Sequence, residues 1–271
     1  MGVVYNFNAG LKTIANAVAQ TITWSATDVA GDGAAAYSFA FRSGAGNDYG
    51  SLSRARIKAS GSTLVDVAQA HLTAYIQRMS TSKFAMAGAD TEFTVPLYTL
   101  DSKGPERYAA GFANGQSPTL EIVLDGTGAA GTIEAGWRLY EGQFPFYSML
   151  LGSQLNIAAS ATNGRFPITQ PGLFRGFSID ITGLNRLRLV INGKQLINLS
   201  GPLLEQSQAM EGQDGGTGGS PMFFKVDEML PITAGNSFVE IDTGAGWGGT
   251  GNEITLLTYV PQEATNGNNG G

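Results

Sequence analysis

Two segments carry the glycine spacing of a dinucleotide-binding loop. Residues 126–131 and 244–249 both have the pattern Gly-x-Gly-x-x-Gly, and each follows a predicted strand directly. That pattern binds a pyrophosphate only where a helix comes next, because the amides at the helix N-terminus hold the phosphates. Here the next residues alternate between apolar and polar positions, which is typical of a strand. Both segments are therefore predicted to be glycine-rich hairpin loops, and no cofactor is expected.

Acidic residues at strand spacing match part of a glycosidase site. Glu240 and Asp242 fall on one face of a predicted strand, as do the first two acids of the Glu-x-Asp-x-Glu pattern of jelly-roll glucanases. The third acid is missing, because position 244 is glycine. In the first half of the chain, Glu121 and Asp125 stand four positions apart with only apolar residues between them. Solvent-facing carboxylates are the favoured interpretation, and no catalytic residue is predicted.

The loops contain acids and one tryptophan that could bind ligands. Asp28, Asp32, Asp48 and Asp214 could offer oxygens to calcium, but none has EF-hand spacing. A structural calcium site is left open, and no metal ligand is assigned. Trp247 stands among glycines, where its ring could stack on a sugar, contact a partner chain, or fold back over the end of a sheet.

A stretch of the chain occurs twice, 132 positions apart. Residues 52–72 and 184–204 align without a gap and share Leu, Arg, Arg, Gly and Leu at matching positions. Further matches follow at shorter offsets, 131 for Phe93 with Phe224 and 119 for Glu121 with Glu240. The period is too long for a solenoid and suits a duplicated domain. We therefore expect two copies of one small fold.

Composition supports two globular copies. The chain has 271 residues, 42% hydrophobic and 14% charged, which is enough apolar material for two cores of roughly 100 to 150 residues each. We place the first copy in residues 1–145 and the second in residues 146–263. The Gly- and Asn-rich residues 264–271 are predicted to be a disordered tail.

Most apolar positions alternate, which predicts an all-β fold of antiparallel sandwiches. In the first copy, Ala55 and Ile57 fall on one face and Arg54, Arg56 and Lys58 on the other; residues 186–191 repeat the pattern. These basic rows could face solvent, lipid phosphates or the carboxylates of a neighbouring subunit. The other predicted strands are residues 21–24, 37–41, 93–100, 120–124, 133–140, 155–159, 177–181, 223–228, 238–241 and 254–260.

One short helix per copy is predicted after a strand-Gly-strand hairpin. Apolar residues recur every three or four positions over residues 64–79, and Thr63 and Asp66 have the spacing of a capping box. In the second copy, Ser200 is the expected N-cap and Pro202 lies in the first turn.

The only histidine, His71, lies in the first predicted helix. A Ser-His-Asp triad or an imidazole metal site would have to use it. The repeat aligns His71 with Leu203, which is expected on the buried face of the second helix. We therefore interpret His71 as a half-buried packing residue.

Charge and motif content exclude several classes of protein. The net charge is −6 without a basic arm, so direct sequence-specific binding of nucleic acid is not expected. The absence of cysteine excludes disulfides and thiol catalysis. No apolar stretch of about 20 residues and no signal-peptide pattern occurs, so we expect a soluble protein made in a cytoplasm.

Residues 52–79 and 184–210, each a hairpin followed by a helix, carry a resemblance to a known family. A tandem pair of jelly rolls with these segments, in an acidic chain without cysteine, resembles the double jelly-roll major capsid proteins of icosahedral bacteriophages with an internal membrane. The corticovirus-type proteins are the nearer likeness and the tectivirus-type proteins a more distant one. The resemblance rests on architecture, because no signature motif is involved.

That resemblance implies a structural protein of the virion capsid and no enzyme. The family forms homotrimers whose six jelly rolls make a pseudo-hexameric capsomer. Its partners are neighbouring capsomers, penton or minor capsid proteins and, in some members, the inner membrane of the virion. Two alternatives remain open: a tandem jelly-roll protein that binds or cleaves carbohydrate, and a minor virion spike.

Overall fold

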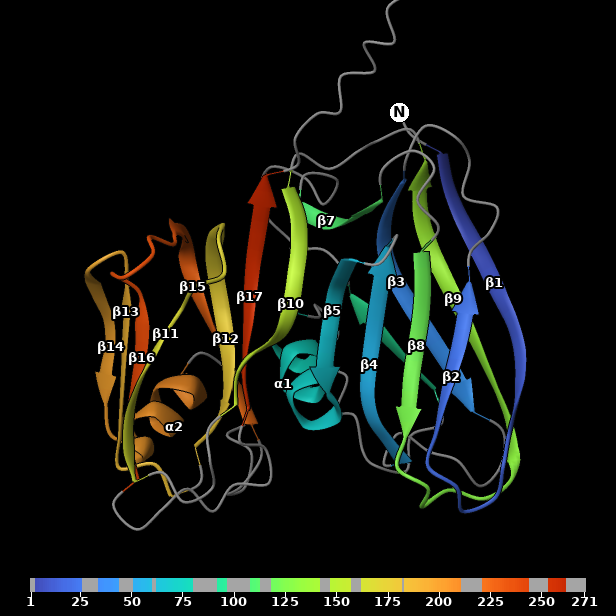
Figure 1. The fold of residues 1–271 in the computed structure, drawn as a ribbon, viewed down its shortest axis with the longest axis horizontal. Coiled ribbons are helices and arrows are strands. Elements are labelled where there is room, and N and C mark those ends of the chain that lie inside the picture. The colour runs from blue at the N-terminus through green and yellow to red at the C-terminus, as the bar shows by residue number, and fades with distance from the viewer. Residues whose placement is uncertain are drawn as a thin grey trace, which may run out of the picture.

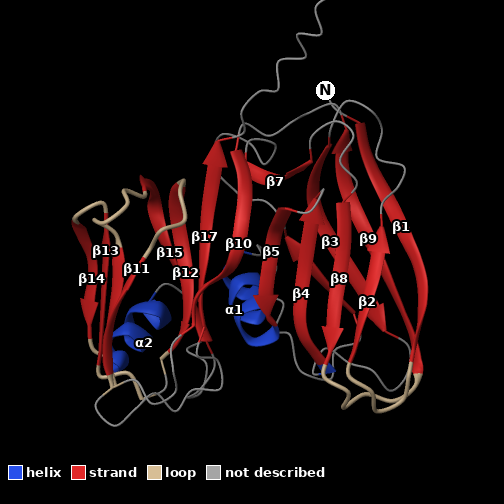
Figure 2. Ribbon diagram, in the orientation of Figure 1, coloured by secondary structure: helices blue, strands red, loops and turns tan. Residues whose placement is uncertain are grey.

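The structure, a computed structural model, is mainly β (Figure 1). It describes residues 3–25, 34–43, 51–59, 62–79, 92–96, 108–112, 118–141, 147–156, 162–181, 183–210, 221–243 and 253–261. The strands of the first half are β1 (Val3–Ile14), β2 (Gln20–Ser25), β3 (Ala34–Ser43), β4 (Leu52–Ala59), β5 (Ser62–Ala68), β6 (Glu92–Pro96), β7 (Tyr108–Phe112), β8 (Pro118–Leu124) and β9 (Gly131–Glu141). Those of the second half are β10 (Tyr147–Asn156), β11 (Asn163–Pro167), β12 (Leu173–Asp180), β13 (Arg186–Ile191), β14 (Lys194–Leu199), β15 (Pro221–Pro231), β16 (Phe238–Asp242) and β17 (Glu253–Pro261). The helices among these residues are α1 (Gln69–Met79) and α2 (Gly201–Met210), which Figure 2 shows in blue.

Strand pairing follows the same plan in both halves. In the first half, antiparallel pairs give the orders β1-β9-β3-β6 and β2-β8-β4-β5. In the second half they give β10-β17-β12-β15 and β11-β16-β13-β14. The last of these sets is a separate sheet, while the other three join into one because β10 also pairs in parallel with β5 and β7.

The internal repeat is visible in the backbone. The segment β4-β5-α1 reappears 132 positions later as β13-β14-α2. Both hairpins have a register shift at the matching place, between Ile57 and Lys58 and between Leu189 and Val190. In the second hairpin, Asn192 and Gly193 have φ values of 50° and 76°, as a two-residue turn between twisted strands requires.

One match of the repeat needs correction. The register shifts of β3 and β12 show which residues of these two strands correspond. The pairing of β6 with β3 and of β15 with β12 then aligns Val95 with Phe224 and Phe93 with Met222. The offset in this region is therefore 129, and the match of Phe93 with Phe224 was wrong by two residues. A shift of two leaves each side chain on the same face, so the alternation of apolar residues could not reveal it.

The first helix is shorter than predicted. Residues 62–68 are not helical but form β5, which pairs with β4, and α1 begins only at Gln69. Thr63 and Asp66 thus form no capping box. β-Branched Val65 and Val67 are both fully buried in this strand, where their restricted side chains pack well. The second helix begins as predicted, and its first hydrogen bond runs from the amide of Leu204 to the carbonyl of Ser200 at 3.0 Å.

Two clusters of buried apolar side chains fill the two halves. The first cluster contains Trp24 and Ile57, and the second contains Phe177 and Leu189. Side chains from β10, β15 and β17 belong to the first cluster although these strands lie in the second half: Met149, Leu151, Phe223, Leu257 and Tyr259. The β10-β17-β12-β15 set is therefore buried on both faces. One face packs into the core of the second half, and the other packs against the first half.

The loop at residues 126–131 is not a hairpin. It connects β8 to β9, which pair with different neighbours and not with each other. Gly126 has a φ of +89°, and a Cβ there would lie 2.7 Å from the amide nitrogen of Ala19. A strand follows this loop, which argues against a dinucleotide site.

Residues 244–249 lie outside the described residues, as does the tail at 264–271. Of the described helices, neither is long and apolar enough to cross a membrane.

Candidate functional site

The two halves of the chain meet at a junction around helix α1. Helix α1 lies between β5 of the first half and the β10-β17-β12-β15 set of the second (Figure 1). Leu72 and Ile76 are almost completely buried there. The rings of Tyr75 and Phe223 meet edge to face with centroids 5.6 Å apart. The helix therefore belongs to the core of one half and also packs on the sheet of the other.

His71 lies inside this junction and not at a half-exposed position. Its side chain is fully buried, and its Nδ1 lies 2.8 Å from Oγ of Ser178 on β12. Burial disfavours the charged imidazolium and lowers the pKa of His71 to about 4, although the negative charges of Glu253 and Asp180 oppose the shift. The prediction of half burial was wrong because the second half covers the face of α1 that the first half leaves open. His71 is thus a neutral packing residue.

Beside this junction, charged side chains connect β4 and β5 of the first half with β17 of the second. Arg54 on β4 forms an ion pair with Asp66 on β5 and, at 3.1 Å, with Glu253 at the start of β17. Arg56 is 3.1 Å from Asp66. Burial disfavours the charge of Arg54, but hydrogen bonds to Asp66 and Glu253 outweigh it and raise its pKa. The basic row of the first half is therefore used inside the chain.

The second half repeats this constellation on an exposed surface. Arg186, which matches Arg54, is exposed and donates from Nε to Oδ1 of Asn198 at 2.7 Å. Asn198 matches Asp66. Arg188 is opposite Glu240 in the strand register, with Nη1 3.5 Å from Oε2. The same positions that bridge two halves in the first copy thus lie open in the second.

The strand acids are paired with these cations. Glu121 is opposite Arg56 in the register and lies 2.7 Å from Nζ of Lys58. Glu240 pairs with Arg188, and Asp242 is exposed at the end of β16. Asp242 thus faces solvent as predicted, whereas Glu121, whose side chain is only 16% exposed, and Glu240 are partly buried in ion pairs. Glu240 and Asp242 line one pocket together with Arg165, Arg186 and Arg188.

The other candidate residues are only partly placed. Trp24 is buried, and its indole N–H donates to the carbonyl of Gly10 at 2.8 Å. The loop residues Asp28, Asp32, Asp48, Asp214 and Trp247 lie outside the described residues, as does the side chain of Trp137. Within the described ranges, no group of three or more histidine, aspartate or glutamate residues is placed to hold a metal ion.

Sequence reasoning missed the polar residues of the junction. Ser178, which contacts His71, is one of them. On the opposite face of the same strand set, the amide of Gln170 donates to Oγ1 of Thr258 at 2.6 Å. Arg175 donates to the carbonyl of Val226 at 2.8 Å. The available signal was the largely apolar sequence of β17, which is typical of a strand covered on both faces.

Comparisons of the structure with solved structures identify the fold. No protein-family model matches the sequence, and no curated protein sequence matches it. The major capsid protein P2 from bacteriophage PM2 aligns over 97% of this chain and 99% of its own, with a TM-score of 0.70 and 13% identity.

Two further structures agree. A chain of Sulfolobus Turreted Icosahedral Virus aligns over 96% of this chain and 91% of its own, with a TM-score of 0.63 and 12% identity. A chain of the PBCV-1 virus capsid aligns over 95% and 93%, with a TM-score of 0.51 and 10% identity. Over almost its entire length, the chain therefore has the fold of viral major capsid proteins.

Proposed function

We propose that this chain is the major capsid protein of an icosahedral virus. It serves as a structural subunit of the virion shell and catalyses no reaction. The observation that carries this proposal is the alignment with major capsid protein P2 of bacteriophage PM2, which includes 97% of this chain and 99% of that one. A match over the full length of both chains supports a shared architecture and not merely a shared module.

The proposed architecture is a pair of tandem jelly rolls. In each half, eight of the described strands form two four-membered antiparallel sets, with β7 of the first half outside them, and consecutive strands such as β1 and β2 or β8 and β9 fall into different sets. This alternation between two sets is typical of a jelly roll. The first jelly roll occupies residues 1–145 and the second residues 146–263.

The proposed assembly is a homotrimer in which six jelly rolls form a pseudo-hexameric capsomer. Two copies of one fold per chain let three chains present nearly sixfold edges to their neighbours. The exposed position of Arg186 supports assembly, because its counterpart Arg54 pairs with Glu253 of the other half inside the chain. Neighbouring capsomers, penton or minor capsid proteins and an inner membrane are the further proposed partners.

Light scattering on the purified chain tests this function. A trimer of 28.3 kDa chains has a mass of about 85 kDa (3 × 28.3 kDa). A strict monomer that binds or cleaves a glycan contradicts the proposal and supports the carbohydrate alternative. Quantitative mass spectrometry of purified particles distinguishes the two virion roles, since the major capsid protein is the most abundant chain and a spike is rare.

A further inference from the structure

Two strand edges lie at opposite ends of the molecule, β14 at one end and β1 at the other (Figure 1). Among the described residues, β14 pairs only with β13 and β1 only with β9. Their counterparts in the repeat are β5 and β10, which meet inside the chain. There, Val65 is opposite Leu151 and Asp66 opposite Gly152 in a parallel pair. The chain thus contains one completed junction, in which β5 pairs with β10. The edges β14 and β1 correspond to the two sides of a second junction, and they lie far apart in the same chain.

The strand registers identify the matching residues of the second junction. The β1–β9 pair shifts register between Asn8 and Gly10, and the β10–β17 pair shifts between Ser153 and Leu155. When these two shifts are superimposed, Glu134 on β9 takes the position of Glu253 on β17. The offset of 132 places Arg186 at the position of Arg54. Arg186 and Glu134 therefore correspond to the ion pair between Arg54 and Glu253. Arg186 lies next to the β14 edge and Glu134 next to the β1 edge.

We propose that β14, α2 and Arg186 of one chain dock on β1, β9 and β3 of a second copy of this chain. In this contact, Arg186 approaches Glu134 of the partner subunit in addition to the contacts that Glu134 makes in its own chain, as Arg54 contacts Glu253 in addition to Asp66. The inference rests on the proposed assembly function and names the interface through which that assembly occurs. Each chain supplies one β14 surface and one β1 surface, so the contact is head to tail and can close into a ring.

A second pair of positions supports the same contact. Leu203 on α2 matches His71 and is 51% exposed, whereas His71 is fully buried against Ser178. The register shifts of β3 and β12 align Ala40 with Ser178, because Ala40 is opposite Gly136 and Ser178 is opposite Thr255. A polar pair inside the chain is thus replaced by an apolar pair between chains. In the proposed contact, the exposed Leu203 therefore lies opposite the apolar residue Ala40 of the second copy.

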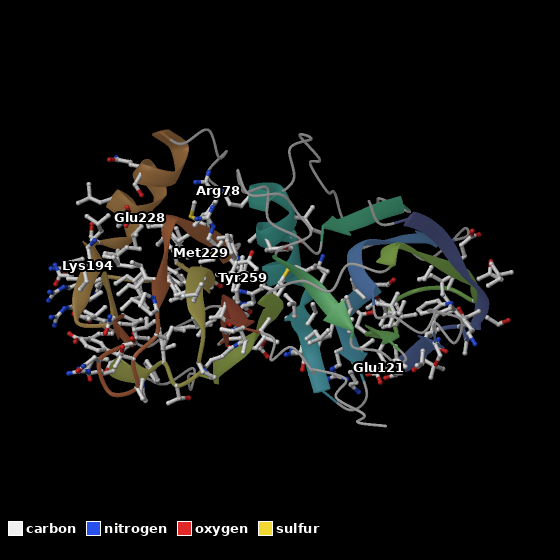
Figure 3. All side chains as sticks on the ribbon, turned by 90° about the horizontal axis from the view of Figure 1, so that it is seen from above. Arg78, Glu121, Lys194, Glu228, Met229 and Tyr259 are labelled. Carbon is white, nitrogen blue, oxygen red and sulfur yellow. The ribbon has the colours of Figure 1, made fainter. Side chains whose placement is uncertain are left out.

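Charge reversal at the two acidic and basic positions tests the inference. Arg186→Glu and Glu134→Arg should each shift the light-scattering mass from about 85 kDa toward 28.3 kDa, with association weakened about tenfold or more. The double variant should recover the mass of the wild-type protein. Glu228→Arg is the matched control, because Glu228 is exposed on β15 (Figure 3), outside the strands and helix of the proposed contact, and its charge change equals that of Glu134→Arg. It should associate normally.

The outcomes separate the interface from the function. If the wild-type chain is a trimer and Arg186→Glu leaves it unchanged, the interface is wrong while the capsid proposal stands. If the wild-type chain is a monomer, the capsid proposal itself is contradicted. Far-ultraviolet circular dichroism verifies that each variant is folded.

A cysteine pair gives an independent readout. The chain has no cysteine, so Leu203→Cys with Ala40→Cys should form disulfides between chains under oxidation and produce cross-linked species on non-reducing gels. Either single variant should not form the linked ladder. A wild-type-like trimer in which the double cysteine variant never cross-links contradicts the proposed contact.

Discussion

Acid should weaken the junction between the halves through His71. Its pKa is lowered from 6.5 to about 4 because burial disfavours the charged ring. The unfolded chain therefore binds a proton below pH 6.5 that the folded chain rejects until about pH 4. This contribution to stability is complete above pH 6.5 and is lost progressively as the pH falls toward 4.

The size of the effect follows from the two pKa values. Between pH 7 and pH 5, linkage gives a loss of about 2 kcal/mol in the free energy of unfolding, and the full shift corresponds to about 3 kcal/mol. The matched variant is His71→Asn, which retains a hydrogen-bonding group near Ser178 but does not titrate in this range. Carboxylates contribute to acid sensitivity equally in both proteins, so the difference between them isolates the histidine.

Urea unfolding of the wild-type chain and His71→Asn at pH 7 and pH 5, at one fixed protein concentration, measures this difference. The wild-type chain should lose about 2 kcal/mol more than the variant over this interval. Equal losses in the two proteins would refute the view that His71 is held neutral in the junction.

Three substitutions elsewhere have distinct expected sizes. Gly126→Ala should lower the free energy of unfolding by about 2 kcal/mol or more, measured by thermal unfolding, because φ is +89° and the new Cβ meets the backbone of Ala19 at 2.7 Å. Gly193→Ala should lower it by only about 1 kcal/mol, because φ is +76° but no atom lies within 4 Å of the new Cβ. Equal costs would argue against the crowded loop. Arg188→Ala should cost less than about 0.5 kcal/mol in the same assay, since Arg188 and Glu240 are each 36% exposed, and a larger loss would show that this pair is more than a surface contact.

Periodicity in the sequence was sufficient to find the repeat and most strands. Ala55 and Ile57 are buried and the basic residues that alternate with them are not, as alternation predicts. The 132-residue offset correctly relates both hairpins and both helices because it follows matched side chains and needs no knowledge of the partners. The strand after residues 126–131 was also predicted correctly, whereas residues 244–249 lie outside the described residues.

The errors occurred where contacts between the halves decide the structure. Residues 64–68 satisfy a helical pattern, yet pairing with β4 and contact with β10 place them in a strand. In β17, Leu257 and Tyr259 face the first half while Ile254 and Leu256 face the second, so no polar face marks the strand. His71 and Leu203 occupy matching positions with opposite exposure, which depends on what covers each helix. Local sequence does not contain that information.

Electron microscopy of the purified recombinant chain tests the central claim most directly. The account predicts particles of three chains with six lobes of density around a threefold axis, one lobe for each jelly roll. Single two-lobed particles at every protein concentration would contradict the assignment of this chain as a capsid-building subunit.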